Sequence, residues 1–152
     1  MRDATEAAAE RLRRVHPDRP VHVSVDDDAS DALGDWDRVA QILDNLVGNA
    51  DRFAPPSTPI DVTVKRGARD VVVTRVADHG PGVPANLQPR VFERFVGDGQ
   101  EGAGSTGLGL AIVKGLVEAH AGRVWLDDSA PDEGAAFAFS LPATPAAKPE
   151  VA

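Results

Sequence analysis

Apolar residues recur every three or four positions between Asp35 and Phe53, and this spacing predicts an amphipathic helix with one buried stripe. Asp35 stands directly before the first apolar position and is expected to cap the helix N-terminus. The expected buried stripe consists of Trp36, Val39, Ala40, Leu43, Leu46, Val47 and Ala50. A second face carries Gln41, Asn45, Asn49 and Arg52, at steps of four, four and three residues. This polar face is equally consistent with a ligand site and with an ordinary solvated surface.

Further periodic segments surround this helix in the N-terminal half. Residues 3–14 are rich in Ala, Glu and Arg and predict a short helix, which we interpret as part of an N-terminal helix and linker over residues 1–20. The long helix must end at Ala54-Pro55-Pro56, because proline cannot continue a helix and restricts the residue before it. The predicted strands of this half are Val21–Val25 and an antiparallel hairpin of Ile60–Lys65 and Val71–Val76.

The C-terminal half begins with a glycine-rich segment at residues 96–106. Its composition fits a surface loop better than a segment that a ligand orders. Helical spacing resumes from Leu108 to His120, and Gly122 is expected to end this helix as the C′ residue. Val124–Leu126 and Ala135–Leu141 predict a final pair of strands.

The order of these elements predicts an α+β fold, a two-layer sandwich with helices on one face of a mixed, mostly antiparallel sheet. The chain has 152 residues, which is about the size of one domain. We expect that domain to span residues 21–142 and a disordered tail to span residues 143–152.

Charge and composition exclude several classes of function. The formal net charge of −8 disfavours a nucleic-acid or anionic-membrane surface, because those partners require a basic patch. The chain has no cysteine, which excludes disulfides and thiolate chemistry, and its four histidines are scattered. The longest apolar run, Gly107–Val117, contains Lys114 and is too short to span a bilayer, and no signal-peptide pattern follows Met1. These features suit a cytoplasmic protein.

Two glycine motifs carry candidate chemistry. The first, Asp78-His79-Gly80-Pro81-Gly82, follows a predicted strand. Its glycines let the backbone approach a ligand, and its carboxylate can accept a hydrogen bond from an exocyclic amine such as that of adenine. The second runs from Gly104 to Leu110 into a predicted helix N-terminus, where exposed amides favour phosphate. Taken singly, each motif fits an ordinary loop or hinge as well.

Four segments in order resemble the conserved boxes of sensor histidine kinases. Asn45–Phe53 resembles the N box, Asp78–Gly82 the first glycine box, Val91–Phe95 the F box, and Gly104–Leu110 the second glycine box. The resemblance covers about residues 21–142. It implies the catalytic ATP-binding domain of a two-component sensor kinase, with the Bergerat nucleotide fold of the GHKL superfamily.

The resemblance also implies a role for each matching residue. Asn49 would coordinate Mg²⁺ with support from Asn45, and Arg52 would contact phosphate. Phe53 would lie against the adenine ring and Asp78 would accept from its amino group. The glycine and lid positions that would complete the site are Gly80 and Gly82 at the adenine wall, Arg94 with Phe92 and Phe95 at the lid base, residues 97–106 as the ATP lid including Thr106, and Gly107, Leu108 and Gly109 at the phosphates.

Two departures from family patterns bear on activity. Relatives that hydrolyse ATP through activated water, such as gyrase and heat-shock chaperones, carry a glutamate base where this chain has Asn45. A carboxamide cannot take a proton, so we expect slow hydrolysis and transfer of the γ-phosphoryl group to a histidine. On the last hairpin, Ala135 stands where relatives often carry threonine, which predicts modest ATP affinity.

The phospho-acceptor histidine of the family is missing from this sequence. None of His16, His22, His79 or His120 stands in the acceptor context, so the acceptor is expected on a separate domain or protein that in turn serves a response regulator. The chain would then be either a fragment of a longer kinase or one subunit of a split kinase. The alternatives are an anti-sigma-factor serine kinase and a non-catalytic module that senses ATP.

Overall fold

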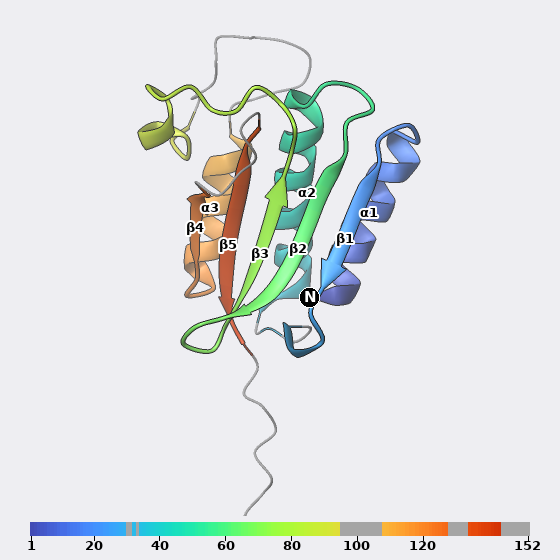
Figure 1. Ribbon diagram of the computed structural model, residues 1–152. Helices are drawn as coiled ribbons and strands as arrows, with labels where there is room; N and C mark the ends of the chain where they lie inside the picture. Colours follow the sequence, from blue (N-terminus) through green and yellow to red (C-terminus); the bar gives the residue numbers. More distant parts are fainter. Residues whose placement is uncertain (30–31, 33, 95–107, 128–133, 144–152) are drawn as a thin grey trace, which may run out of the picture.

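The computed structural model describes residues 1–29, 32, 34–94, 108–127 and 134–143. In this part of the chain, five strands form one sheet and three α-helices cover one of its faces (Figure 1). The strands are β1 (Val21–Val25), β2 (Ile60–Gly67), β3 (Val71–Ala77), β4 (Arg123–Leu126) and β5 (Ala136–Pro142). The helices are α1 (Arg2–Val15), α2 (Trp36–Phe53) and α3 (Gly109–Ala119), with short 3-10 turns at Asp27–Ala29 and Gln88–Arg90.

The sheet is mixed, with strand order β1-β2-β3-β5-β4. β1 runs parallel to β2, and the other neighbours are antiparallel. The predicted two-layer α+β sandwich is therefore confirmed. In β2, side chains alternate between the two faces, so that Ile60, Val62 and Val64 are buried beneath the helices.

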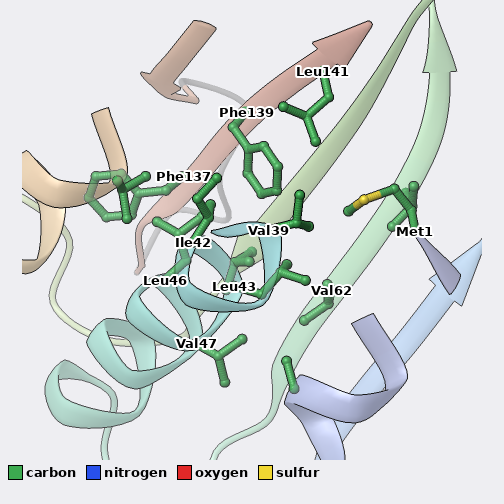
Figure 2. Close-up of a cluster of buried hydrophobic side chains, with 14 of the residues drawn as sticks. Met1, Val39, Ile42, Leu43, Leu46, Val47, Val62, Phe137, Phe139 and Leu141 are labelled. Atoms are coloured by element: carbon green, nitrogen blue, oxygen red, sulfur yellow. The ribbon is translucent and has the colours of Figure 1, made fainter. Parts of the chain in front are cut away.

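α2 lies between α1 and α3 on the covered face of the sheet, and its apolar side forms the centre of the core (Figures 1 and 2). The Oδ1 atom of Asp35 accepts hydrogen bonds from the amides of Asp37 and Arg38, which confirms the predicted N-cap. The predicted stripe is wrong at three positions. Trp36 is 46% exposed and Ala40 is only partly buried, whereas Ile42, which the stripe omitted, is fully buried. α1 and α3 both pack against α2, which widens its covered face.

α1 packs into the same core as the rest of the fold. Met1, Ala8 and Ala9 are buried in the main hydrophobic cluster, so α1 contributes to the packing of the domain. Two arginines of α1 reach the outer edge of the sheet, where Arg13 donates to the carbonyl of Val21 at 2.6 Å and Arg2 to that of Val25 at 3.1 Å. These contacts occupy polar groups of an edge strand that would otherwise be open to pairing.

The end of β5 corrects the predicted start of the C-terminal tail. Pro142 is the last residue of β5, and Ala143 is buried, pairs with Ala32 and donates its amide to the carbonyl of Asp70 at 2.8 Å. Residue 143 thus belongs to the fold. The rest of the predicted tail, residues 144–152, lies outside the described residues.

The end of α3 corrects the role predicted for Gly122. The amide of Gly122 bonds to the carbonyl of Val117 and the amide of Ala121 to that of Glu118, which is the Schellman pattern. The residue with positive φ at C′ is Ala121, at 60°, and Gly122 is the residue after it. Glycine is needed at 122 for a different reason, because a Cβ there would collide with the carbonyl of Ser140.

Replacing Ala121 with glycine should stabilise the protein. An L-residue with φ near 60° costs about 1–2 kcal/mol, and the greater backbone freedom of unfolded glycine offsets part of that gain. We expect Ala121→Gly to raise the free energy of unfolding by about 1 kcal/mol in a urea titration. Ala119→Gly, within the same helix, should lower it by a similar amount, and equal signs for the two variants would contradict this account.

Candidate functional site

Three segments that are far apart in the sequence meet at one end of the sheet. They are the C-terminal half of α2, the loop that follows β3, and the N-terminus of α3. A Cβ on Gly80 would lie 2.8 Å from the carbonyl oxygen of Phe53, and a Cβ on Gly109 would lie 3.6 Å from Oδ1 of Asn45. The N box therefore adjoins the first glycine box and residues 108–110, the described part of the second glycine box.

Asp78 is the buried acidic residue of this region. It follows β3 directly, is only 3% exposed, and donates its amide to the carbonyl of Ala135 at 2.9 Å. Its Oδ1 atom accepts hydrogen bonds from the amides of Gly80 at 2.8 Å and Ala135 at 3.3 Å. Among the described residues, no hydrogen bond to Oδ2 of Asp78 is found. The two bonds to Oδ1 thus fix the orientation of the carboxylate.

Glycines allow close backbone contact around Asp78. Gly82 has a φ of 79°, which disfavours residues with a side chain. A Cβ on Gly82 would lie 3.1 Å from the carbonyl oxygen of Gly134, and a Cβ on Gly134 would collide with the carbonyl of Asp78. Gly134 was missed as a site residue in the sequence. The signal was its place just before the last strand, where the Ala77–Ala136 register sets it beside Asp78.

The polar face of α2 divides into two parts. Asn45 and Asn49 lie one turn apart and are both half-buried, with Asn45 directed toward the start of α3. Arg52 is exposed, and its guanidinium lies 4.3 Å from the ring centroid of Phe53. Gln41 is exposed, its side-chain oxygen accepts from Arg38, and it lies about 6 Å further along the axis from Asn45.

The F box and lid residues are described only in part. Val91 is buried, and Phe92 makes an edge-to-face contact with Phe137 of β5 at a centroid distance of 5.9 Å. Arg94 is exposed. Leu108 occupies the N-cap position of α3 and provides no side-chain cap, and Gly109 begins the helix. The predicted lid residues 97–106 with Thr106, together with Phe95 and Gly107, lie outside the described residues.

Arg19, which belongs to none of the predicted motifs, contacts the C-terminus of α2. Arg19 is only 6% exposed, and its guanidinium contacts the last turn of α2 and the turn that follows. Its carboxylate partner is Asp51 at 2.9 Å.

Residues 34–145 match the family described as histidine kinase-, DNA gyrase B-, and HSP90-like ATPase. The chain belongs to this family. The resemblance drawn from the four boxes is thereby confirmed, and ATP is the nucleotide of this ATPase domain. Within the part that the structure describes, no helix is both long and apolar enough to cross a membrane.

Similar proteins place this ATPase domain with the sensor histidine kinases. The sensor protein DivL of Caulobacter vibrioides is 43% identical over 122 residues, which cover 80% of this chain and 15% of DivL. The solved mycobacterial sensor histidine kinase MprB superposes with a TM-score of 0.83 at 29% identity, over 96% of this chain and 97% of that one.

Full-length ShkA, solved in complex with AMPPNP, superposes with a TM-score of 0.80 at 33% identity, over 97% of this chain and 31% of ShkA. The chain therefore spans a small part of the length of full-size relatives such as DivL and ShkA.

Proposed function

We propose that this domain binds Mg²⁺-ATP between α2, the loop at residues 78–82 and the N-terminus of α3, and that it transfers the γ-phosphoryl group to a histidine on a partner domain or protein. The observation that carries this proposal is the carboxylate of Asp78, held through Oδ1 by the amides of Gly80 and Ala135. ShkA, a relative of the same fold, was solved with an ATP analogue.

Asp78 supplies selectivity for adenine. The exocyclic amine of adenine donates to a carboxylate, whereas guanine would present a carbonyl oxygen to it. An acceptor facing an acceptor in a buried position costs about 1–3 kcal/mol or more. Phe53 is half-buried next to Gly80, where it can cover the ring, and the guanidinium of Arg52 lies beside it for a phosphate.

The carboxamides of α2 fit a magnesium-bound phosphate chain. In the described residues, no group of three His, Cys, Asp or Glu side chains could hold a metal ion. Mg²⁺ usually keeps several waters and is bound through a few protein oxygens together with substrate phosphates, so Asn49 and Asn45 suffice as ligands. Oδ1 of Asn45 faces Gly109 at the start of α3, where amides are available to phosphate oxygens. When bound, the ion neutralises phosphate charge during transfer.

The described residues favour transfer over hydrolysis. Asn45 offers no base to activate water, and the neighbouring Asp44 is an exposed residue bonded to Arg11 at 2.8 Å. A histidine acceptor needs no such base. His120 cannot serve, because Nε2 accepts from the amide of Asp35 at 3.1 Å and Nδ1 lies 2.7 Å from the carbonyl of Leu116. We infer that the acceptor lies on another domain or on a second protein, with a response regulator downstream.

Labelled ATP tests this function directly. The purified domain is mixed with candidate acceptor domains, and we expect phosphate to appear on a histidine of the acceptor while free phosphate accumulates slowly. Acid lability of the product would separate phosphohistidine from the phosphoserine that an anti-sigma-factor kinase would make. Rapid release of free phosphate by the isolated domain, or no transfer to any acceptor despite ATP binding, would contradict the proposal.

Ala135→Thr should tighten ATP binding. The carbonyl of Ala135 accepts from the amide of Asp78, and the amide of Ala135 donates to Oδ1 of Asp78. A hydroxyl at residue 135 would therefore add a hydrogen-bonding group on the adenine side of the site. One such bond contributes about 0.5–1.5 kcal/mol, which is about two- to tenfold in Kd. Ala135→Val has the same shape without the hydroxyl and serves as the control. Calorimetric titration of both variants decides the point, and equal affinities would show that the hydroxyl adds nothing.

A further inference from the structure

Arg19 joins segments that lie far apart in the sequence. It follows α1 and precedes β1, and every nitrogen of its guanidinium donates to the region after residue 50. Nε donates to Oδ1 of Asp51 at 2.9 Å, and one terminal nitrogen donates to the carbonyls of Asp51 at 3.0 Å and Ala54 at 3.1 Å. The other terminal nitrogen donates to the carbonyls of Pro55 at 2.8 Å and Thr58 at 2.7 Å.

This segment needs a donor from elsewhere because of its own sequence. The last carbonyls of a helix have no partner within the helix, and Pro55 and Pro56 contribute no N–H groups. Ser57 has a φ of 69°, so the turn is held in a conformation that residues with side chains avoid. A buried guanidinium satisfies several carbonyls at once, and its charge suits the negative end of the helix dipole.

The anchored backbone brackets two residues of the nucleotide site. Arg19 bonds to the carbonyls of Asp51 and Ala54, and Arg52 and Phe53 lie between them. The carbonyl of Phe53 in turn contacts Gly80, whose amide holds Asp78. Displacement of the backbone at residues 51–54 would thus move Arg52, the expected phosphate contact, and Phe53, the expected adenine contact, together with the loop at Asp78.

We propose that Arg19 is a positioning residue for nucleotide binding, which fixes Arg52 and Phe53 against the Asp78 loop without touching ATP itself. This inference rests on the proposed function, since it concerns the same site. Asp51 assists Arg19, because its carboxylate contacts both Arg19 and His16, the latter at 3.2 Å.

The test compares Kd values for Mg²⁺-ATP and Mg²⁺-ADP in Arg19→Met, Arg19→Lys and Arg11→Met. Arg11 is the matched control, because it also pairs with an aspartate of α2 but at an exposed position, Asp44. We expect Arg19→Met to weaken both nucleotides by on the order of tenfold, Arg19→Lys to weaken them less, and Arg11→Met to leave both unchanged. If Arg19 acted only through its positive charge, Arg19→Met would weaken the binding of ATP more than that of ADP, and Arg11→Met would weaken nucleotide binding as well.

Stability is separated from positioning by repeating Arg19→Met in the Ala121→Gly background. If Arg19 acts on the site, the affinity remains weak when the free energy of unfolding is raised; recovery of the wild-type Kd would overturn the inference. Should Arg19→Met fail to fold in both backgrounds, Arg19→Lys decides, and a wild-type Kd in that folded variant overturns the inference too. Failure of the proposed function is distinct, because the wild-type protein itself would then bind no Mg²⁺-ATP.

Discussion

Asp78→Asn is expected to weaken ATP binding by about a hundredfold while leaving the fold intact. The asparagine keeps Oδ1, which can still accept from the amides of Gly80 and Ala135. In place of Oδ2 it presents an NH₂ group, so a donor faces the amino group of adenine. The loss combines a hydrogen bond to a charged group with an unpaired donor, together about 3 kcal/mol, or about a hundredfold in Kd.

Isothermal titration with Mg²⁺-ATP measures this effect, and urea unfolding confirms that the variant is folded. Asp44→Asn is the matched control, because it removes a carboxylate from an exposed position of α2 that contacts Arg11. A Kd within threefold of wild type for Asp78→Asn, at unchanged stability, would show that this carboxylate does not hold the base; the fold change is set by the hydrogen-bond energies above.

The helical and strand periods of the sequence were sufficient to predict the architecture. α2 was predicted with its N-cap because eighteen helical residues repeat the apolar spacing several times. Its exact buried face was not, since Ile42 lies outside the predicted stripe and is fully buried. Flanking helices add burial that no single-helix pattern contains. Trp36 shows the converse, because it fits the apolar period of α2 and is nevertheless 46% exposed, while Val39 in the same turn is fully buried.

The site was predictable where its residues form short motifs and not where distant backbone completes it. Asp78 and its two glycines stand within five positions. Residue 134 must be glycine because a Cβ there would collide with the carbonyl of Asp78, and Arg19 donates to carbonyls up to 39 positions away. Every residue has a backbone carbonyl, so the residue types alone do not indicate which carbonyls a distant side chain contacts. The closest signal for Arg19 was the run of prolines after α2, which lacks N–H donors and so implies that a side chain must supply them.

Distant backbone also determines why Ala121, and not Gly122, has the positive φ. A glycine just after a helix is usually predicted to be the C′ residue. Here glycine is required one position later, because the carbonyl of Ser140 on β5 leaves no room for a Cβ at residue 122. Ala121 therefore adopts the strained positive φ at C′, while the adjacent residue 122 must be glycine. Only the tertiary approach of β5 to the end of α3 reveals it.

Asn49→Ala is expected to lower the rate of phosphoryl transfer by on the order of a thousandfold, because it removes a magnesium ligand. This corresponds to an increase of about 4 kcal/mol in the activation barrier. Asn49 is half-buried one turn after Asn45 on α2, and an alanine there retains helix propensity, so the fold should persist. Transfer is measured with labelled ATP and an acceptor domain, while ATP binding is measured with and without Mg²⁺.

The magnesium dependence makes this test specific. In Asn49→Ala, Mg²⁺ should no longer strengthen ATP binding, whereas the weaker binding without Mg²⁺ should match wild type because the adenine contacts of Asp78 remain. Binding to the acceptor should also survive. Asp44→Ala, an exposed neighbour on the same helix, should transfer phosphate normally. Transfer by Asn49→Ala within tenfold of wild type would remove this carboxamide from the metal site, since losing a ligand of the catalytic ion costs several kcal/mol.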